Sequence, residues 1–360
     1  MMKQPKRSQL ISNKEHQRRN TRVRLYDDEI EAINNLRRLW NEAVDSGMNP
    51  TEVKHGWLKD KTKSLFVKNH LYQEPEERQI KDLFQELLSE FKEYKPKFPK
   101  IEYKKCKDPH LFVLDPADIH VGKLCSSFET AVKYDSQIAV QRVREGVEGL
   151  LNKIQGYDIE QIVFVAGNDV LHVDTPKRTT TSGTQQDTSG MWYDNVLMAK
   201  DLYVDIIERL RTVAPVHCMF NPSNHDYMSG FMLLQIIEAW FKDCEDVDFN
   251  ASMAHRKYYS YGDNLIGTTH GDGAKLNDLP LLMASEAKEW SKCKKRYLYT
   301  HHIHHYKGKD YPGVTLESLR SPSEADSWHH RNGYEHSPVA IEGFLHHKKH
   351  GQVNKLTHHF

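Results

Sequence analysis

Short apolar runs, each followed by polar residues, dominate the pattern of the second two thirds of the chain. The runs cover residues 111–114, 162–166, 216–220, 265–267 and 297–299. Runs this short and this apolar are typical of strands that are buried on both faces. Stretches with helical spacing lie between them, roughly at 135–155, 194–213, 230–242 and 276–290. This alternation predicts an α/β fold in which helices cover a central sheet.

The N-terminal part has a different pattern. Residues 1–20 are polar and basic without periodicity, so we expect a disordered basic arm. A short alternating run over 21–26 predicts a strand, and Asp27 can cap a helix whose apolar positions run from Ile30 to Ala43. A basic strand before a capped helix superficially resembles a ribbon-helix-helix DNA-binding unit, but a clear second helix of that unit is missing.

A second amphipathic helix is expected further along, over 75–94, because its apolar residues repeat at helical spacing. The Lys- and Pro-rich stretch at 94–99 then reads as a linker. We therefore predict three parts: a disordered basic arm at 1–20, a small helical extension with its linker at 21–99, and a main domain at 100–360.

Charge is balanced over the chain as a whole, with 50 basic and 50 acidic residues. No global field therefore favours nucleic acid or a membrane. The first 24 residues are an exception, because eight Lys and Arg residues there face one acid, Glu15. Such an arm can contact phosphate groups, and a solvated tail is the equally weighted alternative.

Cysteine usage indicates a reducing compartment. The five cysteines are odd in number and lack close CxxC spacing. The chain opens without an apolar signal segment, and no run approaches the length of a membrane span. We expect a cytoplasmic protein with no membrane contact.

Seven residues that follow the apolar runs have side chains that bind metal ions. In chain order they form an Asp-x-His pair, a lone Asp, the Asn of an Asn-His-Asp triplet, a lone His and a His-x-His pair. They are Asp118, His120, Asp169, Asn224, His270, His302 and His304. Imidazole, carboxylate and amide together suit manganese, iron or zinc, and a shared carboxylate can bridge two ions about 3.5–4 Å apart. The series predicts two divalent cations and metal-assisted attack of water on a phosphate ester.

Other histidines form pairs that lack such partners. These are His329-His330, His346-His347 and His358-His359, and we interpret them as surface residues. His302 and His304 differ from them, because side chains at i and i+2 of an extended segment share one face and can hold neighbouring ions.

The ordered motifs resemble those of the calcineurin-like metallophosphoesterases, whose pattern is D-x-H, G-D, G-N-H-D/E, a lone H and G-H-x-H. The similarity covers about residues 111–306 and departs at three spacer positions, which are Asn168, Ser223 and His301. Asp169 followed three residues later by His172 is similar to the G-D-x-x-H step of nuclease-type members. The resemblance implies a four-layer β-sandwich flanked by helices.

The resemblance also implies a role for each site residue. One ion would be held by Asp118, His120 and His304, the other by Asn224, His270 and His302, with Asp169 bridging them. His225 would donate a proton to the leaving oxygen while Asp226 orients its ring. His172 would either contact the phosphate or support a metal ligand. Mn²⁺ is the expected metal, with Fe²⁺, Zn²⁺ and Ni²⁺ as alternatives.

Three segments outside the motifs have open interpretations. The polar loop at 175–190 is long for a connection and is expected either to cover the site or to be mobile. Arg320, in a polar and aromatic segment, is either a phosphate clamp or part of a loop at the sheet edge. Runs at 339–345 and 352–356 predict a strand hairpin that completes the second layer.

The favoured substrate is a phosphodiester in DNA or another nucleic acid. The basic arm, the Lys-rich residues 100–107 and the Asp169-x-x-His172 step, which is similar to that of repair exonuclease subunits, support it. The overall arrangement also resembles phosphoesterases of tailed phages, which would act in the cytoplasm of a bacterial host.

Two other function classes remain open at this point. The enzyme alternative is a phosphomonoesterase for a small molecule or a phosphoprotein, which would have a small closed pocket where a nuclease has an open basic groove. The non-enzyme alternative is a DNA- or partner-binding protein with a structural metal site. A protein partner or a homo-oligomer fits either alternative.

Overall fold

The computed structural model describes residues 8–11, 23–59, 64–72 and 96–360. The chain divides into two compact units, Met1–Lys95 and Pro96–Phe360. The helix predicted over 75–94 lies outside the described residues. So does most of the predicted basic arm, except for a short strand, β1 (Ser8–Ile11), in a stretch where we expected no structure. No helix of the described segments is long and apolar enough to cross a membrane.

The N-terminal unit is built around one long helix. β1 pairs antiparallel with β2 (Val23–Tyr26), and α1 (Asp27–Asp45) follows directly. These elements confirm the strand and helix predicted from residue 21 to residue 43. A 3₁₀ turn, η2 (Pro50–Glu52), leads into an antiparallel hairpin of β3 (His55–Lys59) and β4 (Ser64–Lys68), which the sequence reading did not predict.

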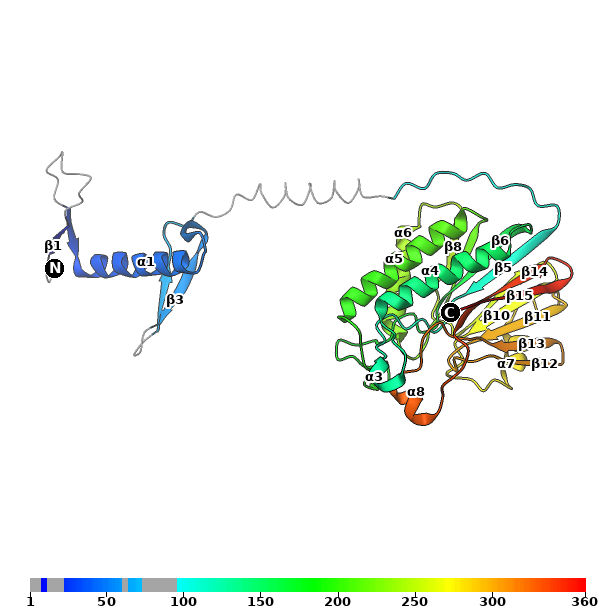
Figure 1. Ribbon diagram of the computed structural model, residues 1–360. Coiled ribbons are helices and arrows are strands. Elements are labelled where there is room, and N and C mark those ends of the chain that lie inside the picture. The colour runs from blue at the N-terminus through cyan, green and yellow to red at the C-terminus, as the bar shows by residue number, and fades with distance from the viewer. Residues whose placement is uncertain (1–7, 12–22, 60–63, 73–95) are drawn as a thin grey trace. The chain divides into compact units, whose positions relative to one another are not determined.

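The C-terminal unit contains two large sheets (Figure 1). The first has six strands in the order β15-β14-β5-β6-β7-β8, and its strands β5 to β8 are parallel. Its strands are β5 (Pro109–Asp115), β6 (Asp158–Gly167), β7 (Val216–Asn221), β8 (Val247–Asn250), β14 (Ala340–His347) and β15 (Gly351–His359). All five predicted apolar runs are strands, three of them in this sheet and two in the next.

The second sheet has five strands in the order β12-β13-β11-β10-β9, with β10, β11 and β13 parallel to one another. Its strands are β9 (Arg256–Tyr261), β10 (Asn264–Thr269), β11 (Lys295–Thr300), β12 (Lys307–Tyr311) and β13 (Val314–Ser318). The sequence reading predicted β10 and β11 but missed the three others.

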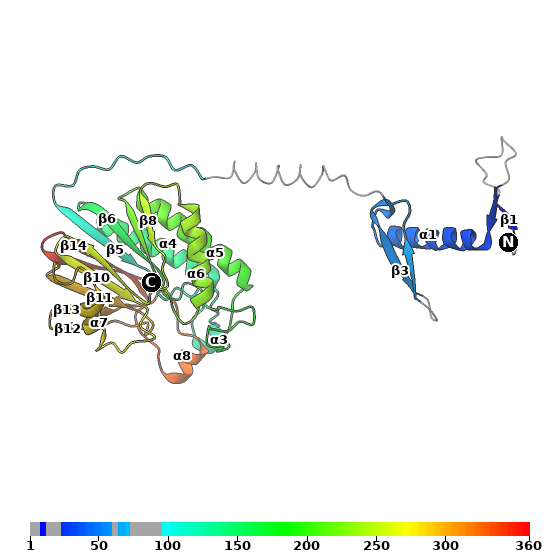
Figure 2. The same cartoon turned by 180° about the vertical axis from the view of Figure 1, so that it is seen from behind.

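Helices cover the outer faces of both sheets. Three long helices lie over the six-stranded sheet, as Figures 1 and 2 show from opposite sides: α4 (Ser136–Lys153), α5 (Trp192–Arg211) and α6 (Tyr227–Trp240). The shorter α7 (Leu279–Glu286) packs on the five-stranded sheet. These are the four helices that the spacing predicted. Two short helices, α3 (Ser127–Thr130) and α8 (Ser327–Asn332), were not predicted.

The alternation of side chains along β5 explains the layering. Phe112 and Leu114 point to the helices and join the core formed with α4, α5 and α6. Leu111 and Val113 point to the other side, where they pack with Ile266 and other residues of the second sheet. A strand that is apolar on both faces therefore separates two cores. The predicted four-layer sandwich flanked by helices is confirmed.

Two predictions about the C-terminal segment need correction. The strands β14 and β15 form the expected hairpin, but β14 pairs with β5, so the hairpin extends the first sheet and does not complete the second. His346 is completely buried, with its Nε2 2.9 Å from the Tyr299 hydroxyl, and His347 is also buried. This pair is not a surface feature, because β14 is covered on both faces.

Candidate metal centre

The seven predicted ligands all follow the carboxyl ends of parallel strands. Asp118 and His120 come after β5, Asp169 after β6 and Asn224 after β7. His270 follows β10, and the pair His302 and His304 follows β11. Since the carboxyl ends of parallel strands lie at one edge of a sheet, and the two sheets pack face to face, both edges contribute to one place.

Three of these side chains form a first cluster, Asp118, His120 and His304, whose ligand atoms all lie within 4.8 Å of one another. The Nε2 atoms of His120 and His304 are 3.2 Å apart. Nε2 of His304 is 3.5 Å from Oδ1 of Asp118. Two ring nitrogens and a carboxylate oxygen therefore converge on one point.

A second cluster contains Asp169, His270 and His302. Nε2 of His270 lies 2.9 Å from Oδ1 of Asn224 and 3.2 Å from Oδ2 of Asp169. The rings of His270 and His302 are in edge contact, with centroids 5.1 Å apart. Asn224 therefore lies beside this cluster, and its role as a ligand stays a prediction.

The two clusters are neighbours. The backbone N–H of His302, in the second cluster, donates to Oδ2 of Asp118, in the first, over 3.1 Å. Backbone hydrogen bonds connect the loop after β5 to the loop after β6. The Asp118 N–H donates to the backbone oxygen of Asn168, and the His120 N–H donates to that of Asp169. The extra Asn168 therefore does not displace Asp169. The loops after β5 and β6 thus hold each other in register.

The backbone at these ligands is unusual. Nine described residues other than glycine have a positive φ. Five of them are predicted ligands: Asp118, His120, Asp169, His302 and His304. A sixth, Asn168, directly precedes Asp169. Each such residue costs on the order of 1–3 kcal/mol and persists only where the surroundings impose it. The fold therefore stores backbone strain at this site.

The ionisation of the cluster suits cation ligands. Burial, reinforced by neighbouring histidines, lowers the pKa of His120 well below its usual value. Burial also lowers the pKa of His302 and that of His304. For Asp118, burial would raise the pKa, but His304 and His270 hold it below the ordinary value. Neutral imidazoles and ionised carboxylates are the forms that bind metal.

His270 is the exception among the imidazoles. Burial alone would lower its pKa, but the carboxylates of Asp169 and Asp118 raise it to about 9. In the metal-free protein its ring is therefore a cation between two carboxylates. A bound divalent cation would take over this charge.

The donor set fits two divalent cations. Oδ1 of Asp118, which belongs to the first cluster, is buried without a hydrogen-bond partner among the described residues. Such atoms carry an energetic penalty unless a ligand or an ion satisfies them. Nitrogen donors mixed with a few oxygens suit Mn²⁺, Fe²⁺ or Zn²⁺. Whether Asp169 bridges the two ions stays a prediction.

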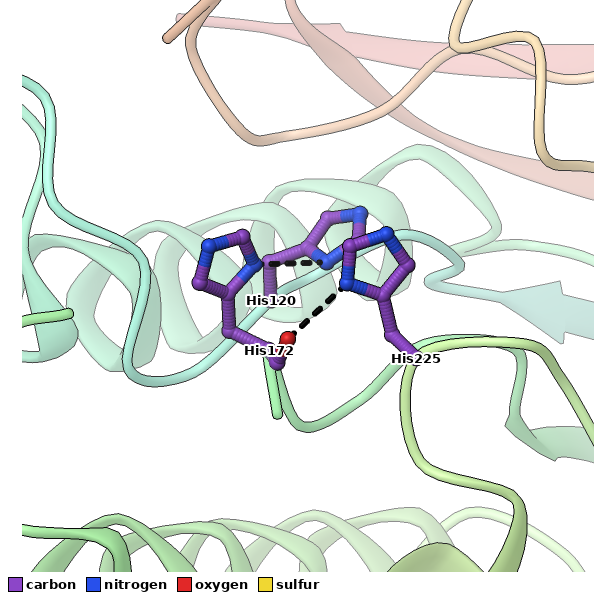
Figure 3. Close-up of side chains that lie close together, drawn as sticks. All are labelled: His120, His172 and His225. Atoms are coloured by element: carbon purple, nitrogen blue, oxygen red, sulfur yellow. Dashed lines mark hydrogen bonds between the residues drawn. The ribbon is translucent and has the colours of Figure 1, made fainter. Parts of the chain in front are cut away.

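His225 lies beside the clusters, but its ring is not held as predicted. Its Nδ1 donates to the backbone oxygen of His172 over 2.9 Å (Figure 3), and its backbone N–H donates to Oδ1 of Asp169. Asp226, expected to orient this ring, is turned elsewhere: its carboxylate accepts from the Leu171 N–H and the Ser223 hydroxyl. That part of the prediction is wrong.

The charge of Asp226 also differs from what an orienting carboxylate needs. Burial and the nearby Asp169 raise the pKa of Asp226 to about 7. It is completely buried and joins the loop after β6 to the loop after β7. We interpret Asp226 as a structural link between these two loops.

His172 contacts a predicted ligand. Its Nδ1 lies 3.3 Å from Nδ1 of His120 (Figure 3). The Nε2 atom of His120 faces His304. If the Nε2 lone pair of His120 is to bind a metal, its Nδ1 must carry the proton and donate to His172. Of the two alternatives left open for His172, this contact favours support of a metal ligand.

Arg320 is engaged away from the clusters. Its Nη1 lies 2.6 Å from Glu342, its backbone N–H donates to the same carboxylate, and its guanidinium lies over the Tyr306 ring. Arg320 does not line the cavity that His120, Asp169 and Asn224 border. The predicted phosphate clamp finds no support in this geometry.

A cavity of about 1180 Å³ opens in front of the clusters. It reaches from His120, Asp169 and Asn224 to the loop at 180–187, which is part of the predicted long loop, and to the segment around α8. That loop is tied to the site, since the Thr181 N–H donates to the backbone oxygen of Asn224. The predicted loop therefore borders the site.

Sequence reasoning missed a chain of contacts that connects α8 to the first cluster. Lys123 is buried and pairs with Asp326 over 3.1 Å. Asp326 also holds Nδ1 of His329, whose ring stacks on that of His304. No spacing marks Lys123 in the sequence, because its partner lies about 200 residues further along the chain. His329, interpreted as a surface residue, is therefore a neighbour of the metal centre.

Comparisons with known proteins give a likeness in structure alone. No family model matches the chain, and no curated protein matches it. Solved structures that align with it include an archaeal phosphodiesterase at 8% identity and a TM-score of 0.34, covering 70% of this chain and 99% of that one. Zinc-complexed Vps29 from Entamoeba histolytica aligns at 12% identity and a TM-score of 0.28, covering 69% and 98%. A predicted phosphoesterase from Streptococcus pneumoniae aligns at 12% and 0.28, covering 70% and 97%.

Proposed function

We propose that the unit Pro96–Phe360 is a metal-dependent phosphoesterase that uses two divalent cations. One observation carries this proposal: ligand atoms from five separate strand ends meet at distances of 2.9–3.5 Å. In the proposed site, Asp118, His120 and His304 hold one cation. Asn224, His270 and His302 hold the other, and Asp169 is shared.

Two bound cations would supply Lewis-acid stabilisation of phosphate oxygens and lower the pKa of a water molecule. The described residues around the cavity do not by themselves attract a phosphate. Among them Lys123 is the one lysine that lines the cavity, no arginine does, and Asp326 neutralises Lys123. Five acidic residues line the same space: Asp169, Asp187, Glu324, Asp326 and Glu335. Substrate binding therefore depends on the cations.

His225 is the proposed proton donor to the leaving oxygen. Because the His172 carbonyl occupies its Nδ1, Nε2 is the ring nitrogen left for substrate. Nε2 has no hydrogen-bond partner among the described residues, and the ring lines the cavity. A proton held at Nε2 would move to the leaving oxygen as the ester bond breaks. His172 acts indirectly, by fixing the ring of His120.

The proposed substrate is a phosphodiester in nucleic acid. The cavity exceeds the roughly 300–1,000 Å³ of ordinary small-molecule sites, which leaves room for groups on both sides of a phosphate. Trp328 and Tyr334, at its rim, are 60% and 65% exposed, and their ring centroids are 5.7 Å apart. Exposed rings of this kind can stack on nucleobases.

A phosphomonoester is the second candidate, and one observation favours it. A polymer needs an open groove with basic residues, yet no unpaired lysine or arginine of the described segments lines this cavity. A small molecule or a phosphorylated side chain would need only the two cations.

The decisive experiment compares four substrates with added Mn²⁺: bis-p-nitrophenyl phosphate, p-nitrophenyl phosphate, labelled single-stranded DNA and labelled double-stranded DNA. The wild type is measured beside Asp169→Asn and beside Asp205→Asn, a matched control on α5 whose partner Arg144 is also solvent-exposed. Cleavage of the diester and of DNA by the wild type and the control, with loss in Asp169→Asn, is the expected result.

Other outcomes are equally informative. Turnover of the monoester alone would replace the proposed substrate by the second candidate. No turnover of any substrate, with metal binding demonstrated by a raised unfolding temperature, would contradict the proposed activity and favour a structural metal site. We place the activity in the cytoplasm, in keeping with the expectation from the sequence.

A further inference from the structure

The hairpin of β3 and β4 in the N-terminal unit has two chemically different faces. Leu58 and Val67 are buried and pack with Leu39 of α1. Gly56 allows this close approach, because a Cβ at that position would lie 2.4 Å from a Leu39 methyl group. Since side chains alternate along a strand, the packing against α1 fixes which residues face outward.

The outward face carries an aromatic pair. Trp57 and Phe66 are cross-strand partners with ring centroids 5.2 Å apart. They are 62% and 42% exposed, and the His55 ring lies 5.1 Å from that of Phe66. Three neighbouring rings therefore form a platform that the described part of the chain leaves open to solvent.

Cations flank this platform. Lys68 is the cross-strand partner of His55, and Lys59 lies two residues beyond Trp57, so both belong to the outward face. Both are exposed, and no ion pair joins either of them to another described residue. Residues 54–70 contain five lysines and one acidic residue. The outward face has no Leu, Ile or Val.

We propose that this outward face, made of His55, Trp57, Lys59, Phe66 and Lys68, binds single-stranded nucleic acid. Unstacked bases would lie on the Trp57 and Phe66 rings, and phosphates would contact Lys59 and Lys68. A duplex hides the faces of its bases, so it would engage the lysines alone. Aromatic residues are enriched at protein interfaces as well, but lysine is depleted there, so Lys59 and Lys68 beside the rings favour nucleic acid over a protein partner.

This binding site is independent of the metal centre. It would supply basic contacts that the described residues lining the cavity of the C-terminal unit do not provide. Binding requires neither cations nor hydrolysis, so it can be measured where the proposed phosphoesterase is inactive. Failure of either proposal would leave the other unaffected.

The test measures fluorescence anisotropy of a labelled oligothymidylate with the full-length chain in EDTA, which prevents cleavage. Trp57→Ala and Phe66→Ala should each weaken binding at least about fivefold, since stacking on one ring is worth on the order of that factor or more. Trp192→Ala, which removes a 45% exposed ring at the start of α5, is the matched control and should bind like the wild type. Lys59→Gln should reduce the slope of log affinity against log salt by about 0.7.

A second variant separates stacking from general apolar contact. Trp57→Leu keeps an apolar side chain but removes the ring, so affinity should fall nearly as far as in Trp57→Ala. Wild-type affinity in Trp57→Leu, or equal affinity of all three alanine variants with unchanged circular dichroism, would overturn the proposal. So would a concentration-dependent dimer that Trp57→Ala abolishes, because the platform would then be an interface between two copies.

Discussion

Nδ1 of His225 donates to the backbone oxygen of His172, 2.9 Å away, and this single hydrogen bond determines which ring nitrogen faces the cavity. The contact joins the loop after β7 to the loop after β6. A backbone oxygen can only accept, so Nδ1 must carry a proton in every ionisation state. Protonation changes occur at Nε2 alone.

His225→Gln should therefore reduce kcat by about 10²–10⁴-fold, the usual contribution of a general acid. Metal affinity should stay near that of the wild type, because His225 is not among the proposed ligands. Steady-state kinetics with bis-p-nitrophenyl phosphate, together with Mn²⁺ titration, would measure both. An equal loss of metal affinity and turnover would instead indicate that His225 is a metal ligand. His120, His172 and His225 do have ring nitrogens within 4.8 Å of one another, close enough to share an ion.

Asp226→Asn tests whether this carboxylate links two loops or orients His225. Replacing one acceptor oxygen by an NH₂ group leaves the Leu171 N–H or the Ser223 hydroxyl without its partner, at a cost of about 1–3 kcal/mol in the free energy of unfolding. Denaturant titration measures that cost. The pH profile of kcat should show the same apparent pKa values in Asp226→Asn as in the wild type. A shift of the apparent pKa that belongs to His225 would instead support an orienting role for Asp226.

Cation affinity should depend on pH because of His270. The carboxylates around its buried ring raise its pKa to about 9, so below that pH a proton must leave before Nε2 can bind a metal. Between pH 6.5 and 8, the Kd for Mn²⁺ should fall by up to about tenfold per pH unit. Calorimetry in buffers of different ionisation enthalpy should detect proton release at pH 7. A Kd that is constant across this range would contradict the binding of a cation by a His270 ring with this raised pKa.

A stability effect is expected far from the centre, at Asp246. Burial alone would raise the pKa of this carboxyl, but hydrogen bonds from Cys244, Tyr103 and Arg211 hold it below the ordinary value. Arg211 also donates to the backbone oxygen of Pro99, so the group fastens the segment before β5 to α5. A carboxyl with a lowered folded-state pKa stabilises the protein above its ordinary pKa of about 4, and the effect disappears as the pH falls below that value.

Asp246→Asn should then lower the free energy of unfolding at pH 7 by about 3 kcal/mol, because the Arg211 charge stays partly buried without its partner. The difference from the wild type should shrink progressively as the pH falls below about 4 and through the lowered pKa of the folded state. Asp248→Asn, whose carboxylate is mostly exposed, serves as the control and should change stability little. Urea denaturation at both pH values gives the comparison.

Parallel buried strands made much of the main domain predictable. Residues 162–166 are apolar throughout because β6 is covered on both faces, and the chain turns polar where that cover ends, at Asp169. The same rule placed the candidate ligands after β5, β7, β10 and β11. The sequence could name these candidates because each strand end carries a side chain that can bind a metal.

Contacts between distant segments could not be predicted in the same way. The burial of His346 depends on Tyr299, which lies 47 residues earlier. Asp226 follows His225 directly, so proximity in sequence suggested a contact that the turn after β7 directs elsewhere. The β3–β4 hairpin was not predicted because its outward positions carry aromatic residues as well as lysines. The segment therefore lacks the clear alternation of apolar and polar residues that is expected of a strand with one solvent-exposed face.

The left-handed backbone at the metal centre restricts which residues can replace the ligands. Aspartate, asparagine and histidine adopt positive φ more readily than other non-glycine residues, and they are also the side chains that bind borderline metals. Glutamate at position 118 or 169 would keep the charge but fit the backbone less well, and glycine would relax the backbone but remove the donor. Chain geometry and coordination chemistry thus select the same small set of amino acids, so an engineer who wishes to change the metal has few single substitutions to choose from.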